Sequence, residues 1–121
     1  MSEHMKVKGM ISTDVRLTLV STNLAFGKWV DAPKSSIGTN GTSTTNQAFE
    51  AQGRLGTATG TEGTVEYRAD DGAAFHLSFD NPYIGDNKAA IAAPAGRPYS
   101  CSVDFPRSGS DITVTWQINK K

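Results

Sequence analysis

Apolar and polar residues alternate one by one along several short stretches of this chain. The clearest stretch lies near the C-terminus, and its apolar members are Ile112, Val114, Trp116 and Ile118. Because successive side chains of a strand point to opposite faces of a sheet, this spacing predicts a strand with one buried face and one face in water.

A second signal combines two alternating stretches with a short acidic segment between them. Val65 and Tyr67 belong to the first stretch, and Phe75 and Phe79 belong to the second. The intervening residues 70–72 read Asp-Asp-Gly, and an Asp-Gly step between two such runs is typical of a β-hairpin. We therefore predict a hairpin with a loop of about three to five residues.

The other stretches predict further short strands and no long helix. We expect strands at 6–11, 15–19, 26–30, 47–51 and 100–105, whereas 89–93 is either a strand or a loop. Residues 35–45 are almost entirely Ser, Thr, Gly and Asn, which predicts a mobile surface loop. Seven to nine short strands separated by turns predict an all-β fold, a single-domain antiparallel β-sandwich over 1–121. Within it, we expect 1–5 to be disordered or left over from expression.

Composition and charge narrow the classes of partner. The chain has 121 residues, which suits one domain, and 12 glycines, which suit a turn-rich β protein. Twelve basic residues balance 12 acidic ones, so a nucleic acid is not expected as the main partner, nor is recruitment by a polybasic segment. The N-terminus lacks the basic and apolar regions of a signal peptide. We expect synthesis in the cytoplasm without a classical signal peptide.

Candidate catalytic and metal-binding residues are few. Cys101 is the only cysteine, which excludes an internal disulfide, and its alternation with Val103 predicts a core position. His76 falls on the polar face of its strand, and no spacing pairs it with a nucleophile or an orienting carboxylate. Acidic pairs such as Asp70-Asp71 lie in turns but lack the spacing of a calcium loop. We expect neither an enzyme nor a cofactor or metal.

Nine of the ten aromatic residues fall into two groups. Five occupy the apolar phase of strands, where packing in the core explains them, namely Tyr67, Phe75, Phe79, Phe105 and Trp116. Four others lie at turns or strand ends, namely Phe26, Trp29, Tyr83 and Tyr99. Tyr and Trp carry an apolar body and a polar tip, which suits a lipid headgroup boundary or a sugar ring. The alternative is that these rings close the open ends of the sandwich.

Several motifs resemble those of a known family. They are Gly60-Thr61-Glu62-Gly63-Thr64, Phe79-Asp80-Asn81-Pro82-Tyr83, Gly85-Asp86-Asn87-Lys88 and Gly27-Lys28-Trp29. Together they resemble the aegerolysins, and most closely the small component of two-component insecticidal crystal toxins of bacilli. The resemblance covers about two thirds of the chain. It implies a β-sandwich that binds a membrane sphingolipid or sterol-containing lipid outside the producing cell, together with a larger pore-forming protein partner.

The resemblance also implies a set of lipid-binding residues at the matching positions. They are Phe26, Lys28, Trp29, Glu62, Asp80, Asn81, Pro82, Tyr83 and Lys88. The chain departs from the mushroom members of the family at two places. They carry a glutamate where this chain has Thr59, and they carry tryptophan where it has Phe26 and Tyr83.

The strand pattern itself argues for a partner. A membrane β-barrel strand needs about nine to eleven residues with an apolar outer face, but the strands predicted here use their apolar face for the core. We therefore expect a protein that docks to a membrane and recruits. A homo-oligomer is left open. The alternatives are a lectin-like sandwich that binds glycans through Trp29, Tyr83, Asp80 and Asn81, and an interaction module without a small ligand.

Overall fold

In the computed structural model, the described residues are 5–54 and 59–121, and they contain ten strands and no helix. The strands are β1 (Val7–Thr13), β2 (Leu17–Phe26), β3 (Lys28–Asp31), β4 (Ser36–Ile37), β5 (Thr44–Gln52), β6 (Thr61–Ala69), β7 (Ala74–Asn81), β8 (Lys88–Ala92), β9 (Tyr99–Asp104) and β10 (Ile112–Lys120).

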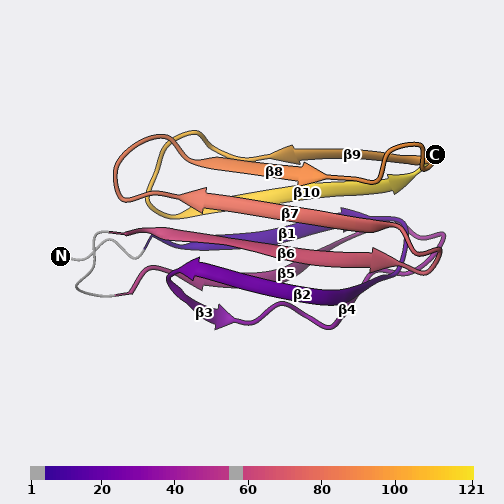
Figure 1. Ribbon diagram of the computed structural model, residues 1–121, viewed down its shortest axis with the longest axis horizontal. Coiled ribbons are helices and arrows are strands. Elements are labelled where there is room, and N and C mark those ends of the chain that lie inside the picture. The colour runs from indigo at the N-terminus through magenta and orange to yellow at the C-terminus, as the bar shows by residue number, and fades with distance from the viewer. Residues whose placement is uncertain (1–4, 55–58) are drawn as a thin grey trace.

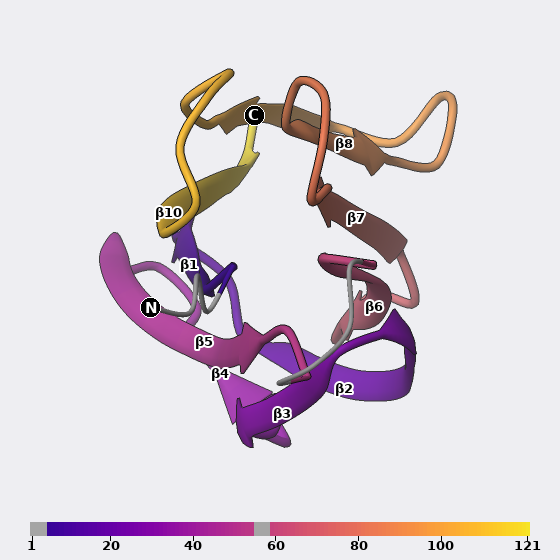
Figure 2. The same ribbon diagram turned by 90° about the vertical axis from the view of Figure 1, so that its left-hand side faces the viewer.

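The strands form two five-stranded sheets that face each other (Figures 1 and 2). Sheet A has the order β3-β5-β1-β10-β9, and sheet B has the order β4-β2-β6-β7-β8. The predicted all-β sandwich is thus confirmed. Two features differ from the expectation: β1 and β10 pair in parallel, and the number of strands exceeds nine. A parallel pair between the two ends of the chain leaves no local trace in the sequence.

The predicted hairpin is β6 and β7. Tyr67 lies opposite Phe75 and Val65 lies opposite Leu77, so the apolar residues of both strands share the inner face of sheet B. All four of these side chains are buried. The turn over 70–73 includes Gly72 with a φ of 89°, a left-handed conformation that glycine adopts without strain.

A cluster of four aromatic rings joins the two sheets in the core. Phe49 lies 5.1 Å from Phe79, 5.4 Å from Trp29 and 5.8 Å from Trp116, measured between ring centroids. Phe79 belongs to sheet B and the other three rings to sheet A. Trp116 Nε1 also donates a hydrogen bond of 2.9 Å to the carbonyl of Ala90 on β8, which ties the edge of sheet B to sheet A.

Between residues 15 and 45, the predicted strand boundaries differ from those in the structure. The strands expected at 15–19 and 26–30 are β2 and β3, and β2 runs without a break to Phe26. The loop expected at 35–45 contains β4, and Thr44 already belongs to β5. The reason is Ile37, the one apolar residue of that segment, which is only 4% exposed and draws the backbone against β2.

The two ends of the sandwich carry different loops. The Tyr83 end, on the left of Figure 1, consists of the β2–β3 turn, the β7–β8 loop and the β9–β10 loop. The Asp70 end, on the right, consists of the β1–β2 and β6–β7 turns, residues 38–43 and the β8–β9 loop. Nowhere in 5–54 or 59–121 is there a helix long and apolar enough to cross a membrane.

Candidate functional site

Three charged residues of the predicted site form one row across sheet B. Glu62 on β6 lies directly opposite Asp80 on β7, and Asp80 lies opposite Lys88 on β8. Directly opposite residues of antiparallel strands point to the same face, with Cβ atoms about 5 Å apart. Glu62 and Lys88 are exposed, so this row stands on the outer face of the sheet.

The row borders a groove on that outer face. Its volume is about 410 Å³, and small side chains leave it open. Besides the three charged residues, it is lined by Ala25, Thr64, Ser78 and Ala90 among others. The short side chains come from the outward-facing positions of β2, β6, β7 and β8. The charged row lies at one end of the groove.

Apolar side chains stand exposed next to this row. Ile84 is 86% exposed and Tyr83 is 52% exposed, both on the β7–β8 loop. Phe26, at the end of β2, is 45% exposed and lies opposite Glu62 in the strand register. Ile84 was not among the predicted site residues. Its one signal in the sequence is that it is an apolar residue between Tyr83 and Gly85, outside any alternating stretch.

The β7–β8 loop is fixed to the β9–β10 loop by Asn87. Its side-chain amide donates hydrogen bonds to the carbonyls of Pro106 (3.1 Å) and Gly109 (3.3 Å), and its backbone amide donates to the carbonyl of Arg107 (2.8 Å). Because Asn87 is buried, these bonds hold the base of the loop while leaving Ile84 in water.

Asn81 lies in the interior, unlike the other charged and polar members of the predicted set. It is 0% exposed, and its Nδ2 donates to the carbonyls of Ser110 (2.7 Å) and Lys6 (3.3 Å). The neighbouring Thr61 hydroxyl donates to the carbonyl of Met5 at 2.6 Å. Met5 is itself buried. The role of Asn81 here is to hold together segments of the Tyr83 end.

Two of the four turn aromatics are directed inward. Trp29 is half-buried and makes edge contacts with Phe49 and Phe79, as part of the core cluster. Tyr99 is 9% exposed and belongs to the Asp70 end, where its ring makes an edge contact with Phe75. For these two rings, closing the sandwich is the interpretation that the structure supports.

Close backbone contacts explain two glycines of the family motifs. A Cβ on Gly60 would lie 2.4 Å from the carbonyl oxygen of Asn81, and one on Gly27 would lie 2.6 Å from that of Gln52. Both glycines also have positive φ, 74° and 107°. Gly60 lets the chain before β6 approach the start of the β7–β8 loop closely, and Gly27 lets the chain turn between β2 and β3.

The Tyr83 end thus gathers most of the predicted residues. On its surface, fully or in part, are Phe26, Lys28, Glu62, Asp80, Pro82, Tyr83 and Lys88. Trp29 reaches the same end mainly as a core residue, and Asn81 lies beneath the surface. Thr59 is exposed.

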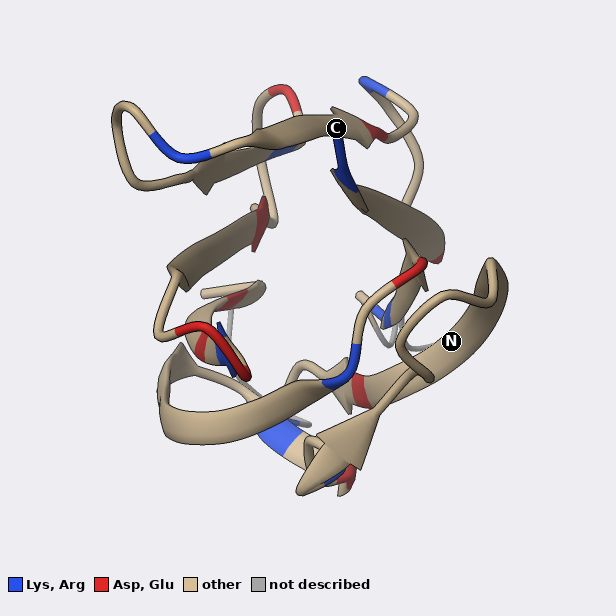
Figure 3. Ribbon diagram, turned by 90° about the vertical axis from the view of Figure 1, so that its right-hand side faces the viewer, with Lys and Arg blue, Asp and Glu red and all other residues tan. Residues whose placement is uncertain are grey.

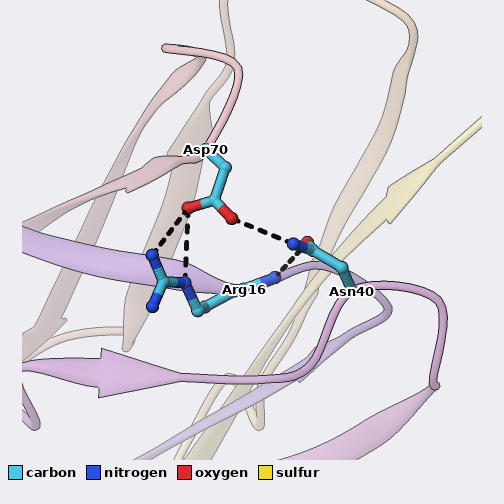
Figure 4. Close-up of polar contacts among 3 residues, drawn as sticks. All are labelled: Arg16, Asn40 and Asp70. Carbon is cyan, nitrogen blue, oxygen red and sulfur yellow. Dashed lines mark hydrogen bonds and ion pairs between the residues drawn. The ribbon is translucent and has the colours of Figure 1, made fainter.

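A second polar cluster lies at the Asp70 end, where the sequence predicts only a turn. Figure 4 shows Asp70 accepting hydrogen bonds from Asn40 Nδ2 (2.9 Å) and from Arg16 Nε (3.3 Å). The backbone amide of Arg16 in turn donates to Asn40 Oδ1 at 2.8 Å. The hydrogen bond from Asn40, followed by that from Arg16, lowers the pKa of Asp70 below its ordinary value.

Asp71 is held in a similar way by three other residues. The backbone amide of Ala73 donates to Asp71 Oδ1 (3.0 Å), the Tyr99 hydroxyl donates to Oδ2 (2.8 Å), and Arg97 lies 3.3 Å from Oδ1. These hydrogen bonds, that of Ala73 first, lower the pKa of Asp71. Burial of Tyr99, together with its bond to Asp71, raises the pKa of the phenol to about 12.

The residues considered for catalysis do not meet. His76 stands on the outer face of sheet B, with its Nδ1 3.6 Å from Glu66 Oε1, whereas Cys101 packs against the core from β9 of sheet A. Burial raises the pKa of the Cys101 thiol, which disfavours the reactive thiolate. Among the described residues, no group of three or more His, Cys, Asp or Glu is placed to hold a metal ion.

Comparisons with known proteins agree with this architecture. A sequence model of the aegerolysin family matches residues 3–99. No curated protein sequence matches the chain. One similar solved structure is the lipid-binding protein Nakanori, with a TM-score of 0.75 at 14% identity, over 96% of this chain and 71% of that chain.

Two further solved structures are similar along nearly their whole length. The RahU protein, solved in complex with a Tris molecule, has a TM-score of 0.71 at 19% identity, over 99% of this chain and 98% of that chain. IP-1A from Alcaligenes faecalis has a TM-score of 0.70 at 19% identity, over 99% and 94%. At these identities, the likeness concerns the fold.

Proposed function

Because this chain belongs to the aegerolysin family, we propose that it binds membrane lipid through the Tyr83 end. The similar fold of Nakanori, which is described as a lipid-binding protein, supports this proposal. The observation that carries it is the exposure of Ile84 and Tyr83 on a loop whose base is fixed by Asn87. An isolated apolar tip of this kind costs solubility in water and gains free energy at a bilayer surface.

The chemistry of the Tyr83 end matches the layers of a bilayer surface. Among the large apolar residues described, Ile84 is the most exposed and would enter the acyl region, while the Tyr83 ring suits the headgroup boundary. Lys28 and Lys88 are exposed at the same end, where an ammonium group can contact a lipid phosphate. Glu62 and Asp80 in the groove can accept hydrogen bonds from headgroup donors. A sphingolipid or a sterol-containing membrane is the proposed target.

Replacing Ile84 by serine tests this orientation. Burying an isoleucine side chain is worth about 2 kcal/mol, so Ile84→Ser should weaken binding by roughly tenfold or more. The measurement is sedimentation with vesicles of sphingolipid, sterol and phosphatidylcholine, beside vesicles of phosphatidylcholine alone. Val20→Ser is the matched control, because Val20 is 45% exposed on β2 at a distance from the Tyr83 end.

Three outcomes separate the possibilities. Selective loss of binding in Ile84→Ser supports the proposed orientation. Equal binding by wild type, Ile84→Ser and Val20→Ser would place the membrane contact elsewhere on the molecule. No sedimentation with any vesicle would contradict lipid binding itself.

We further propose that the chain recruits a larger pore-forming protein, as one half of an insecticidal or cytolytic toxin that acts on the outside of target cells. The inward side chains of β6, β7 and β10 are nearly all fully buried, and the outward ones are mostly polar. Turning the apolar faces toward lipid would empty the core, and the polar faces cannot line acyl chains. Docking without perforation is therefore the behaviour that this sandwich supports.

Vesicles filled with a fluorescent dye test the need for a partner. We expect the chain alone to bind sphingolipid vesicles without releasing dye. Release should require a second, larger protein, and a gene for such a protein next to this one is the expected source. Dye release by the purified chain alone, in proportion to bound protein, would contradict the proposal.

The lectin-like alternative loses two of its four predicted residues in this structure. Of the four residues considered for sugar binding, Asn81 is fully buried and Trp29 packs in the core. Tyr83 and Asp80 remain accessible, but Asp80 belongs to the groove of sheet B and Tyr83 to the protruding loop.

A further inference from the structure

The Asp70 end contains a second hollow that the proposed lipid contact does not use. Its volume is about 490 Å³, within the range of small-molecule sites. Its lining residues come from five separate parts of the chain, and those used below are Asp14, Asn40, Asp70, Asp71, Tyr99 and Lys120. The β6–β7 turn, which carries Asp70 and Asp71, lies at the opposite end of the sandwich from the β7–β8 loop, which carries Tyr83 (Figure 1).

The polar groups around this hollow are held in place before any ligand arrives. Asn40 and Arg16 fix Asp70, and the Tyr99 hydroxyl and Ala73 amide fix Asp71, as described above. Asp14 Oδ1 accepts a hydrogen bond of 2.9 Å from the backbone amide of Lys120, and the Asp14 carbonyl accepts one of 2.8 Å from Gly41. Groups locked by such bonds lose little freedom on binding.

These groups can still bind a ligand. A carboxylate offers about four acceptor positions, and Asp14, Asp70 and Asp71 each use only part of theirs in the contacts described. Asp70 and Asp71 remain about 45% and 33% exposed at their side chains. Lys120 and Asn40 are exposed and supply donors. Buried apolar residues, Val15 and Ala69, form the floor.

The charges around the hollow cancel. Three carboxylates, those of Asp14, Asp70 and Asp71, face three cations, namely Lys120 and the two arginines paired with Asp70 and Asp71. Figure 3 shows acidic and basic segments lying next to one another at this end. A cation or an anion therefore gains no net attraction here. A neutral ligand with many hydroxyl groups can donate to the carboxylates and accept from Asn40 and Lys120.

We propose that this hollow binds a neutral sugar, with ring hydroxyls on Asp14, Asp70 and Asn40 and the apolar face of the ring on the Val15–Ala69 floor. The site is independent of the lipid contact. Because it lies at the far end, the protein could hold a glycan while the Tyr83 end rests on a membrane. This residue set differs entirely from the one that the sequence predicts for a sugar.

Nuclear magnetic resonance titration of the full chain tests the proposal. The probes are glucose, galactose, mannose and N-acetylglucosamine, each raised through the millimolar range. We expect at least one sugar to shift the backbone amide signals of Asn40, Gly41 and Asp71, and to leave those of Thr64 and Ala90 in the other groove unchanged. Raising the salt concentration should leave the affinity unchanged, because the ligand carries no charge.

Two variants test the assigned residues. Asn40→Ala and Asp14→Asn each remove or alter one hydrogen-bonding group, and each should weaken sugar binding by about fivefold to tenfold. Asp80→Asn in the other groove is the matched control and should bind sugar as the wild type does. Circular dichroism of each variant reports whether the sandwich is intact, and Asp14→Asn keeps the acceptor that holds Lys120.

The results that would overturn the proposal are distinct from a failure of lipid binding. Absence of shifts with all four sugars contradicts it, as do shifts confined to the Tyr83 end or an affinity that falls steeply with salt. Vesicle sedimentation of Asn40→Ala should equal that of the wild type. Equal sugar binding by the wild type, Asn40→Ala and Asp14→Asn would also overturn the assignment.

Discussion

At the scale of single residues, burial separates neighbours that the sequence treats alike. Asp80, Asn81, Pro82 and Tyr83 follow one another, and the family resemblance assigns all four to lipid. Asp80 and Pro82 are half-buried and Tyr83 is exposed, while Asn81 is fully buried. In an extended strand, adjacent side chains point to opposite faces, so consecutive motif residues cannot all reach one surface. Asn81 supports the site from below.

Replacing Asn81 by alanine should therefore reduce stability. The substitution leaves the carbonyls of Ser110 and Lys6 without their donor in a buried position, which costs about 1–3 kcal/mol. Urea unfolding measures the change. Asn23→Ala, at an exposed position on β2, should stay within about 0.5 kcal/mol of the wild type. Equal midpoints for both variants would contradict this role of Asn81.

At the scale of elements, the packing at the centre of sheet A depends on a glycine, which has no side chain. Gly9 on β1 pairs with Phe49 on β5, and the register shifts directly after this pair. A Cβ on Gly9 would lie 2.3 Å from the Phe49 ring, which is itself enclosed by Trp29, Phe79 and Trp116. Because Gly9 has no side chain, the Phe49 ring can lie directly against the backbone of β1.

Gly9→Ala should accordingly destabilise the sandwich by overpacking. The ring cannot move away without disturbing the four-ring cluster, so a cost of about 1–3 kcal/mol is expected. The free energy of unfolding in urea is the measurement. Lys8→Ala, on the exposed face of the same strand, is the control and should have little effect. If Gly9→Ala were as stable as the wild type, the contact with Phe49 would not be tight.

At the scale of the whole molecule, a filled sandwich holds two chemically different ends apart. The Tyr83 end offers exposed apolar tips and a charged row, and the Asp70 end offers a neutral network of fixed carboxylates. Both ends consist of turns that the two sheets bring together, so neither depends on the other for its geometry. This separation permits two contacts at once.

The Asp70 end should make stability sensitive to acid. The folded pKa values of Asp70 and Asp71 lie below the ordinary value of 3.8, so their contribution is present above that pH and is lost as the pH falls through the folded values. The thermal midpoint, measured from about pH 5 to about pH 2, should therefore fall less steeply in Asp70→Asn than in the wild type.

A second variant separates the effect of the Asn40 hydrogen bond from that of the Asp70 charge. Asn40→Ala keeps the Asp70 carboxylate but removes the hydrogen bond that lowers its pKa most. Its acid profile should lie between those of the wild type and Asp70→Asn. Three superimposable profiles would contradict the coupling of Asp70 to the fold.

Much of the fold could be predicted because its signals are local. Alternation with a period of two located the hairpin of β6 and β7 and the strand β10, and their inward residues are those that the pattern assigns to the core. Glu62, Asp80 and Lys88 come from motif segments, and the structure places them on one face of sheet B, but their contact with lipid stays a prediction. Ile84 was missed because a single apolar residue in a turn carries no periodicity.

The sequence by itself therefore determined most of the strands, their buried faces and the family, because each of these is written in residues close together along the chain. Only the tertiary structure decided which turn residues reach water and which hold the turns together. Asn81 contacts Lys6 across 75 positions, and Arg16 contacts Asp70 across 54. Such contacts depend on how two sheets bring distant turns to one end, and no local pattern specifies that arrangement.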